Sequence, residues 1–177
     1  PSIKLLEINE DQYATLEENM QQVQTMIRNK YKAFYEEQIN KWKVELTEIN
    51  EVWVALSDAQ KTWTFLESLF IGSDEIKKEL PNETEQFVKI DQEVKEILKV
   101  GNNTKNILKF SNTKFEERSL LDWLKDILAR LSVCEKALNT FMETKRVDFP
   151  RFYFMSSVDL LDVLSKGNNP FSINKHI

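Results

Sequence analysis

Glycine and proline are scarce in this chain, with three and four examples among 177 residues. Neither type occurs between Ser2 and Ile71, so the residues that usually end a helix are absent from that span. Long helices are therefore expected there. An alternation of apolar and polar residues, which would predict strands, is also missing, so a sheet of any size is not expected.

Cysteine and histidine occur once each, as Cys134 and His176. A single cysteine excludes an internal disulfide and suits a reducing compartment. One cysteine and one histidine are too few ligands for a Cys/His metal cluster. A nucleophile–histidine pair would depend on His176, and a chain end is a poor place to hold a base. Cys134 falls within an apolar stripe, which predicts a buried packing residue. We expect no catalytic residue, no cofactor site and no metal site in this chain.

Other absences narrow the class further. There is no run of eighteen apolar residues, hence no expected membrane span, and no Gly-x-x-x-x-Gly-Lys-Ser/Thr loop for a nucleotide. The net charge of −5 is unlike that of a nucleic-acid-binding domain. No signal peptide is present, and the first residue is Pro1, which predicts a piece of a longer protein. The length and a 41% apolar content suit one domain or two closely packed subdomains.

Apolar residues recur at steps of three and four, the spacing of one helix face. The pattern predicts long helices at about 10–28 and 31–71, with a break at Arg28-Asn29-Lys30, then a helix at 83–99. Gly72 is expected in a left-handed conformation. Either Ser73 or Asp74 is expected to cap the short turn that follows, and Asn82 to cap the next helix. The Asn-rich residues 101–115 predict a surface loop with some short local structure, anchored by Ile107, Leu108 and Phe110. A helix at 116–146 has the cleanest stripe: Leu120, Leu124, Ile127, Leu131, Cys134, Leu138 and Phe141.

These elements predict an all-α fold, an elongated antiparallel helical bundle. Only residues 151–154 look extended, as an isolated strand or one edge of a hairpin, and a short helix is expected at 157–165. Trp42, Trp53 and Trp63 share or border one stripe, which favours core positions over a docking surface. Trp123 lies one position off its stripe, so both environments stay open for it.

The residues Phe149-Pro150-Arg151-Phe152-Tyr153-Phe154 form the most distinctive segment. Pro150 ends the preceding helix, and the dense aromatics predict a tightly packed corner with buried rings. Arg151 is expected to stack on a ring or to bond the last carbonyls of that helix, in preference to a contact with another domain. Lys145 and Arg146 suit a helix C-terminus because cations are favoured there.

This corner, with the helix ending in Lys-Arg before it, resembles the linker region (N-terminal region 2) of dynein heavy chains. A second stretch, WTFLESLFIGSDEIKKELPNETEQF, is similar to the same region. The residues that match, expected to form the core of the family motif, include Trp42, Trp63, Leu66, Phe70, Leu80, Pro81 and Phe87. Four further segments (FIGSDEI, NKYKAF, CEKAL and SSVDLLDVLSKGNNP) are most like axonemal outer-arm β-type chains, with a cytoplasmic dynein linker as the alternative.

The resemblance implies that residues 1–177 are the N-terminal and middle part of a mechanical linker with no catalysis of its own. In dyneins the linker amplifies nucleotide-driven changes of an AAA+ ring into the power stroke, here for ciliary or flagellar motility. ATP and Mg would bind elsewhere in the parent chain, an ATP-hydrolysing microtubule motor of the cytoplasm, cytoskeleton and axoneme.

The implied partners are the AAA+ ring of the same heavy chain, the remaining linker subdomains, microtubules and other dynein subunits, with no nucleic acid and no membrane. The residues alone leave a helical adaptor or scaffold that binds partner proteins as the alternative. A spectrin-like module would show an internal repeat of roughly a hundred residues, and none is visible.

Overall fold

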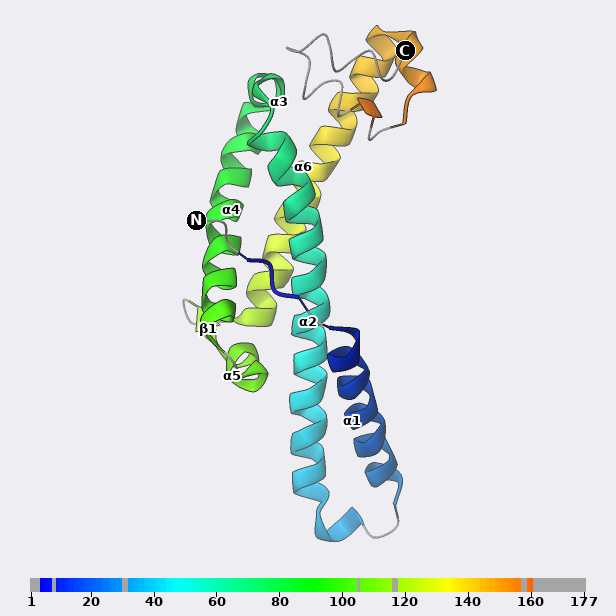
Figure 1. The fold of residues 1–177 in the computed structure, drawn as a ribbon, viewed down its shortest axis with the longest axis vertical. Helices are drawn as coiled ribbons and strands as arrows, with labels where there is room; N and C mark the ends of the chain where they lie inside the picture. The colour runs from blue at the N-terminus through cyan, green and yellow to red at the C-terminus, as the bar shows by residue number, and fades with distance from the viewer. Residues whose placement is uncertain are drawn as a thin grey trace. The chain divides into compact units, whose positions relative to one another are not determined.

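The computed structural model describes residues 4–7, 9–29, 32–104, 106–115, 118–156 and 159–160. The helices are α1 (Glu10–Arg28), α2 (Glu36–Phe70), α3 (Asp74–Glu79), α4 (Pro81–Asn103), α5 (Ile107–Ser111) and α6 (Leu120–Asp148), as Figure 1 shows. Two 3-10 turns, η1 (Lys32–Phe34) and η2 (Pro150–Phe154), and a short antiparallel pair, β1 (Lys114–Phe115) and β2 (Arg118–Ser119), complete the elements. The all-α class predicted from the sequence is confirmed. Within the described ranges, no helix is long and apolar enough to cross a membrane.

The chain divides into two compact units. The first unit consists of Pro1–Asp58 and Lys95–Asp126, and the second of Ala59–Val94 and Ile127–Ile177. Helices α2, α4 and α6 each contribute residues to both units, whereas α1 and α5 belong to the first and α3 to the second.

The core of the second unit lies among α2, α3, α4 and α6. The rings of Phe70 and Phe87 stack with centroids 5.3 Å apart and planes 17° apart, which joins α2 to α4. Such a pair adds about 0.5–1.5 kcal/mol to the energy of burying the rings themselves. The other fully buried large side chains of this unit include Leu66, Ile76, Ile90, Ile127 and Leu131.

The core of the first unit is built from the N-terminal half of α2, the end of α4, α5 and the start of α6. Its buried side chains are Ile49, Val52, Ala55, Leu56, Ile97, Leu98, Phe110, Leu120 and Leu124. Gly101 of α4 allows a close approach, because an added Cβ would meet Leu6 Cδ1 at 2.4 Å and Phe110 Cε2 at 3.2 Å. The N-terminal segment is also held by Asn102, whose Nδ2 donates to the carbonyl of Lys4 over 2.9 Å.

The helix ends follow local sequence chemistry. Asn9 and Gln12 form a reciprocal capping box at the start of α1. The predicted break near Arg28 is confirmed, because α1 ends there. Of the two predicted alternatives, Ser73 caps α3, and its side chain accepts from the Ile76 amide.

Two of the predicted helix-end details are wrong. Gly72 is not left-handed; it is required because an added Cβ would lie 2.3 Å from the carbonyl oxygen of Ser68. Asn82 lies inside α4, because Pro81 takes the first helical position. An N–H at that position has no acceptor within the helix, so proline loses no hydrogen bond there.

Two segments also differ from their predicted conformation. Helix α4 runs on to Asn103, past its predicted end at 99, and the short local structure expected within 101–115 is α5, which the Asn106 side chain caps through the Lys109 amide. Residues 151–154 are not a strand but part of η2, where Phe149 accepts from the amide of Phe152 over 2.9 Å. Pro150 fixes a φ compatible with a helical turn as well as with a strand, and the turn forms. Of the predicted helix 157–165, only 159–160 are described and are helical.

Candidate functional site

A buried hydrogen bond joins α2 to α4 in the second unit. Trp63 Nε1 donates to Asp91 Oδ1 over 3.1 Å, and the two residues are only 4% and 7% exposed. A buried indole N–H and a buried carboxylate each need a polar partner, which this contact supplies. The predicted core position of Trp63 is confirmed.

An ion pair joins α6 to α4 in the same unit. Arg130 approaches Glu93 in a bidentate arrangement, with Nη1–Oε1 at 2.8 Å and Nη2–Oε2 at 2.5 Å. Both side chains are partly buried, so solvent screens the pair less than it would a surface pair. Together with the Trp63–Asp91 bond, this pair forms a brace that links α2, α4 and α6, and we call these four residues the helix brace. The apolar periodicity of the sequence could not predict either contact, because each one joins polar groups from two different helices.

The remaining motif residues occupy different environments. Leu66, Phe70 and Phe87 are fully buried in the second unit. Leu80 is partly buried where α3 meets α4, and Pro81 is exposed. Thus the motif includes core side chains and residues that set a helix start.

Trp42 is 52% exposed, so its predicted core position is wrong. Its spacing correctly puts it on the stripe of α2, but spacing does not tell how many helices cover that stripe. Near Trp42 the stripe borders pockets between α1 and α2, whereas at Trp63 it is enclosed. Trp53 and Trp123 are both partly buried.

The aromatic corner is more open than predicted. Phe154, Tyr153 and Phe149 are 93%, 57% and 48% exposed, and only Phe152 is partly buried. The prediction that the Phe154 ring is buried in the corner is therefore wrong. In a 3-10 turn, consecutive side chains point in different directions around the axis, so they cannot all face the core. The Arg151 guanidinium lies 6.0 Å from the centre of the Phe152 ring, in agreement with the predicted stacking.

The basic pair before the corner acts structurally. Lys145 lies 3.7 Å from the carboxylate of Glu79 and 5.2 Å from the centre of the Phe141 ring. Arg146 bonds Glu143 at 2.6 Å and the carbonyl of Met155 at 3.4 Å. These contacts tie the end of α6 to α3 and to the turn that follows.

Cys134 is fully buried on α6, as predicted. Its Sγ lies 3.9 Å from the Glu83 carbonyl oxygen. Burial, followed by the nearby negative charge of Glu83, raises the pKa of the Cys134 thiol. The thiol is therefore protonated near neutral pH and is a poor nucleophile.

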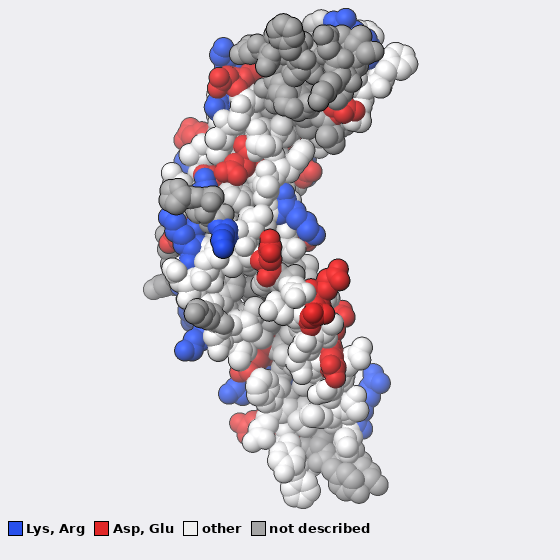
Figure 2. All heavy atoms as spheres, viewed as in Figure 1, with Lys and Arg blue, Asp and Glu red and all other residues white. Residues whose placement is uncertain are grey.

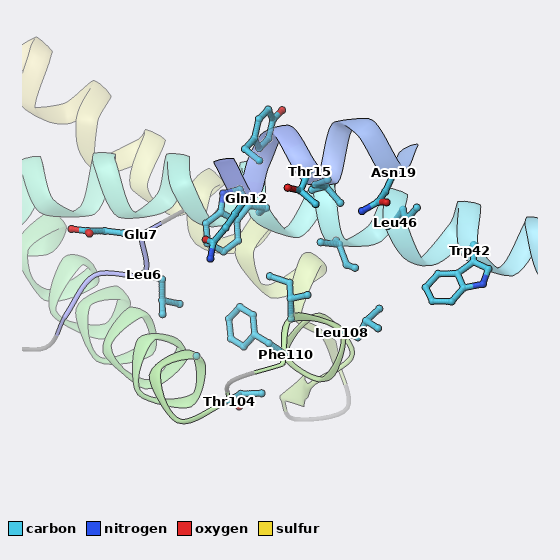
Figure 3. A pocket seen from close by; sticks show the side chains of 16 residues that line it. Leu6, Glu7, Gln12, Thr15, Asn19, Trp42, Leu46, Thr104, Leu108 and Phe110 are labelled. Atoms are coloured by element: carbon cyan, nitrogen blue, oxygen red, sulfur yellow. The ribbon is translucent and has the colours of Figure 1, made fainter. Parts of the chain in front are cut away.

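An apolar pocket opens in the first unit, with a volume of about 550 Å³. Figure 3 shows Leu108 and Phe110 rising from α5 on one side and Thr15 and Asn19 facing them from α1. Leu6 lies at one end and Trp42 at the other. We call this surface the α1–α5 groove; its lining also includes Tyr13, Leu16, Leu46, Ile49, Trp53 and Ile107. Sequence reasoning missed it because its lining comes from four separate segments.

Among the described residues, no group of three or more His, Cys, Asp or Glu side chains is placed to hold a metal ion. On the face seen in Figure 2, basic and acidic side chains are interspersed, with uncharged surface between them. The helix brace, the α1–α5 groove and the exposed corner are the main features of the described residues that bear on function.

Comparison with known proteins gives consistent matches along the whole chain. The family model for the dynein heavy chain, N-terminal region 2, matches residues 2–177. The chain is 43% identical over 175 residues to the dynein alpha chain of the flagellar outer arm of Chlamydomonas reinhardtii. It is 41% identical over 175 residues to the ciliary dynein beta chain of Heliocidaris crassispina, and 39% identical over 176 residues to dynein axonemal heavy chain 9 of Homo sapiens. Each alignment covers 99% of this chain but 4% of the relative, so the chain spans a small part of the relatives' length.

Proposed function

We propose that this chain, which belongs to the dynein heavy chain N-terminal region 2 family, is a non-catalytic mechanical linker segment of an axonemal dynein heavy chain. In this role it converts nucleotide-driven changes of the AAA+ ring into the power stroke of ciliary or flagellar motility. The parent chain is an ATP-hydrolysing microtubule motor of the axoneme, whose ATP and Mg bind outside residues 1–177. The names of its relatives, which are flagellar, ciliary and axonemal, support this location.

The helix brace is the observation that carries the proposal. A segment that transmits force must resist sliding of its helices along one another. Apolar faces alone resist separation better than they resist sliding, because their contacts are not directional. The Trp63–Asp91 hydrogen bond and the bidentate Arg130–Glu93 pair are directional, and together they fix the register of α2, α4 and α6.

The helices themselves support the same function. α2, α4 and α6 are 35, 23 and 29 residues long, and Gly101 is the only glycine within them. Continuous backbone hydrogen bonding makes such elements stiff along their axes. The partners of the proposed linker are then the AAA+ ring and the remaining linker subdomains of the same heavy chain.

The test uses the parent motor with a reversed charge in the brace. Glu93→Arg places two cations together and should slow microtubule gliding several-fold, while ATP turnover and microtubule binding stay near wild type. The matched control is the exchanged pair Glu93→Arg with Arg130→Glu, which should recover most of the gliding velocity. Unchanged gliding by the Glu93→Arg motor would contradict a force-bearing role for the brace. Equal loss of gliding and ATP turnover would indicate a catalytic or folding role instead.

A further inference from the structure

A small pocket lies where the N-terminal segment meets the end of α4. It has a volume of about 290 Å³ and is lined by Lys4, Lys99, Asn102 and Asn103. All four residues are exposed, and none of them is acidic or aromatic. We call it the Lys4–Lys99 pocket. It belongs to the first unit and contains no residue of the helix brace or of the α1–α5 groove.

The two sides of the pocket are held together by Asn102. Its Nδ2 donates to the carbonyl of Lys4 and to the carbonyl of Leu98, each over 2.9 Å. Asn102 and Asn103 follow Lys99 by three and four residues, which places all three on one face of α4. The backbone of the N-terminal segment is therefore fixed against the helix face that carries the other lining residues.

The end of a helix carries partial negative charge, equivalent to roughly half an elementary charge, which disfavours an anion. At the end of α4 several of the last carbonyls already have donors. The amide of Thr104 donates to Val100 over 2.9 Å and to Gly101 over 3.2 Å, and the Asn102 side chain donates to Leu98. Two lysine ammonium groups beside these bonded carbonyls leave the pocket with a positive potential.

Positive charge also predominates in the stretch that contains the pocket. Residues 95–114 carry five lysines and one acidic residue, Glu96, which lies outside the lining. Residues 115–126 carry four acidic residues and two basic ones, and the described ones also lie outside the lining. In the N-terminal segment, Glu7 lines the α1–α5 groove instead. No described acidic side chain therefore neutralises the pocket from within.

Both lysines of the pocket are available to a ligand. None of the ion pairs among the described residues engages Lys4 or Lys99. Lys89, earlier on α4, is by contrast paired with Glu85 over 3.0 Å. Two cations beside one pocket repel each other, and an anion bound between them relieves that repulsion.

The lining favours a polypeptide over a nucleic acid. Lysine donates to carboxylates and phosphates alike. A carboxamide both donates and accepts, so Asn103 can also bond the amide and carbonyl groups of a peptide backbone. Sites for single-stranded nucleic acid add aromatic side chains on which bases stack, and none of the four lining residues is aromatic. The net charge of −5 further opposes a long polyanion.

We propose that the Lys4–Lys99 pocket binds an acidic polypeptide segment, with carboxylates at Lys4 and Lys99 and the peptide backbone against Asn103. The pocket shares no residue with the helix brace, so this proposal does not depend on the linker function.

The probe is an acetylated and amidated peptide of about ten residues in which glutamate alternates with glycine and serine. The control peptide has glutamine in place of each glutamate. Calorimetry on the 177-residue chain at low salt should give a dissociation constant below about 100 μM for the acidic peptide and no saturable binding of the control. Raising the salt from about 20 to 200 mM should weaken binding at least about fivefold, because exposed charges are screened.

Nuclear magnetic resonance locates the binding site on the same chain. The side-chain amide signals of Asn102 and Asn103 should shift with the same saturation curve as the calorimetry. The side-chain amide signal of Asn40, on α2 and outside the pocket, should not move.

A matched set of variants tests the two lysines. Lys99→Gln should weaken binding at least about threefold, and the double variant with Lys4→Gln at least about tenfold. Both residues are exposed, so folding should be unaffected. Lys136→Gln removes the same charge from an exposed position of α6 in the second unit and should leave binding unchanged.

Several results would overturn the proposal. They are the absence of saturable binding by the acidic peptide, equal binding of the glutamate and glutamine peptides, and equal effects of Lys99→Gln and Lys136→Gln. Tighter binding of a ten-nucleotide thymidine strand than of the acidic peptide would assign the pocket to nucleic acid. Self-association of the chain that Lys99→Gln abolishes would assign it to a second copy of the chain, and either result would reject the acidic segment.

Discussion

The indole nitrogen of Trp63 and the carboxylate of Asp91 are 3.1 Å apart in the core of the second unit, and they connect α2 to α4 through residues that are 28 positions apart in the sequence. This contact is directional, so its geometry favours one alignment of α2 on α4. A shift by one residue would leave both groups buried away from their present partner.

Replacing Trp63 with phenylalanine should lower the free energy of unfolding by about 1–3 kcal/mol, because the ring's apolar contacts are mostly kept while the hydrogen bond to the buried carboxylate is lost. Urea denaturation followed by circular dichroism measures the change. Trp42→Phe, at the exposed position on the same helix, is the control and should change stability by less than about 0.5 kcal/mol. Equal effects at the two positions would refute the importance of the bond to Asp91.

The Arg130–Glu93 pair should show a coupling free energy of about 1 kcal/mol in a double-mutant cycle with Arg130→Met and Glu93→Gln. The bidentate geometry and the partial burial raise this value above that of an ordinary exposed pair. The Lys89–Glu85 pair on the surface of α4, with side chains 65% and 73% exposed, provides the comparison and should couple more weakly. A coupling free energy of zero between Arg130 and Glu93 would show that this pair does not contribute to the brace.

The raised pKa of the Cys134 thiol predicts a pH dependence with a definite sign. The unfolded chain loses the thiol proton at a lower pH than the folded chain. Stability linked to this group is therefore present below the thiol's unfolded pKa and is lost as the pH rises through the folded pKa. Denaturation measured from neutral to alkaline pH should show this decline in the wild type. Its size should decrease in Cys134→Ala, and an identical slope in the two proteins would contradict the prediction.

Gly72 and Gly101 should respond differently to alanine. At Gly72 the new Cβ meets a backbone oxygen at 2.3 Å, which cannot move easily, so Gly72→Ala should cost about 1–3 kcal/mol. At Gly101 the nearest atom is the end of the Leu6 side chain, and alanine also has the higher helix propensity by about 1 kcal/mol. Gly101→Ala should thus be close to neutral in thermal denaturation. A larger loss at Gly101 than at Gly72 would show that the N-terminal segment is packed more rigidly than its contacts indicate.

The exposed corner should tolerate truncation at its tip. Phe154→Ala should change stability by less than about 0.5 kcal/mol because the ring is 93% exposed. Phe152→Ala should cost more, about 1–2 kcal/mol, since that ring is partly buried and lies beside Phe149 with centroids 5.5 Å apart. Chemical denaturation of both variants measures which of the two substitutions lowers the free energy of unfolding more.

Helix periodicity predicted the long elements well because each has a broad buried face. The α1 boundaries and the break after Arg28 agree with the prediction, as do the buried Cys134 and Trp63. Periodicity failed where the environment of a face, rather than its existence, was in question. Trp42 and Trp63 have the same spacing on α2, yet one is half exposed and the other is enclosed.

Short elements were predicted less well because competing conformations differ little in local propensity. The residues after Pro150 suited both an extended segment and a 3-10 turn, and the turn formed. Asn106 was placed in a loop with some short local structure, and its role as the cap of α5 was not predicted. The helix brace and the α1–α5 groove depend on which helices become neighbours, and that information is absent from any single stretch of sequence.

Helix continuity across the two units has a consequence for cooperativity. The change from one unit to the other falls inside α2, α4 and α6, at Asp58, Val94 and Asp126, and not in loops. Unfolding either unit alone would therefore create three new frayed helix ends, each with unsatisfied backbone groups. The two units should melt together in one transition, so stability gained at the helix brace would be shared by residues of the first unit that do not contact it.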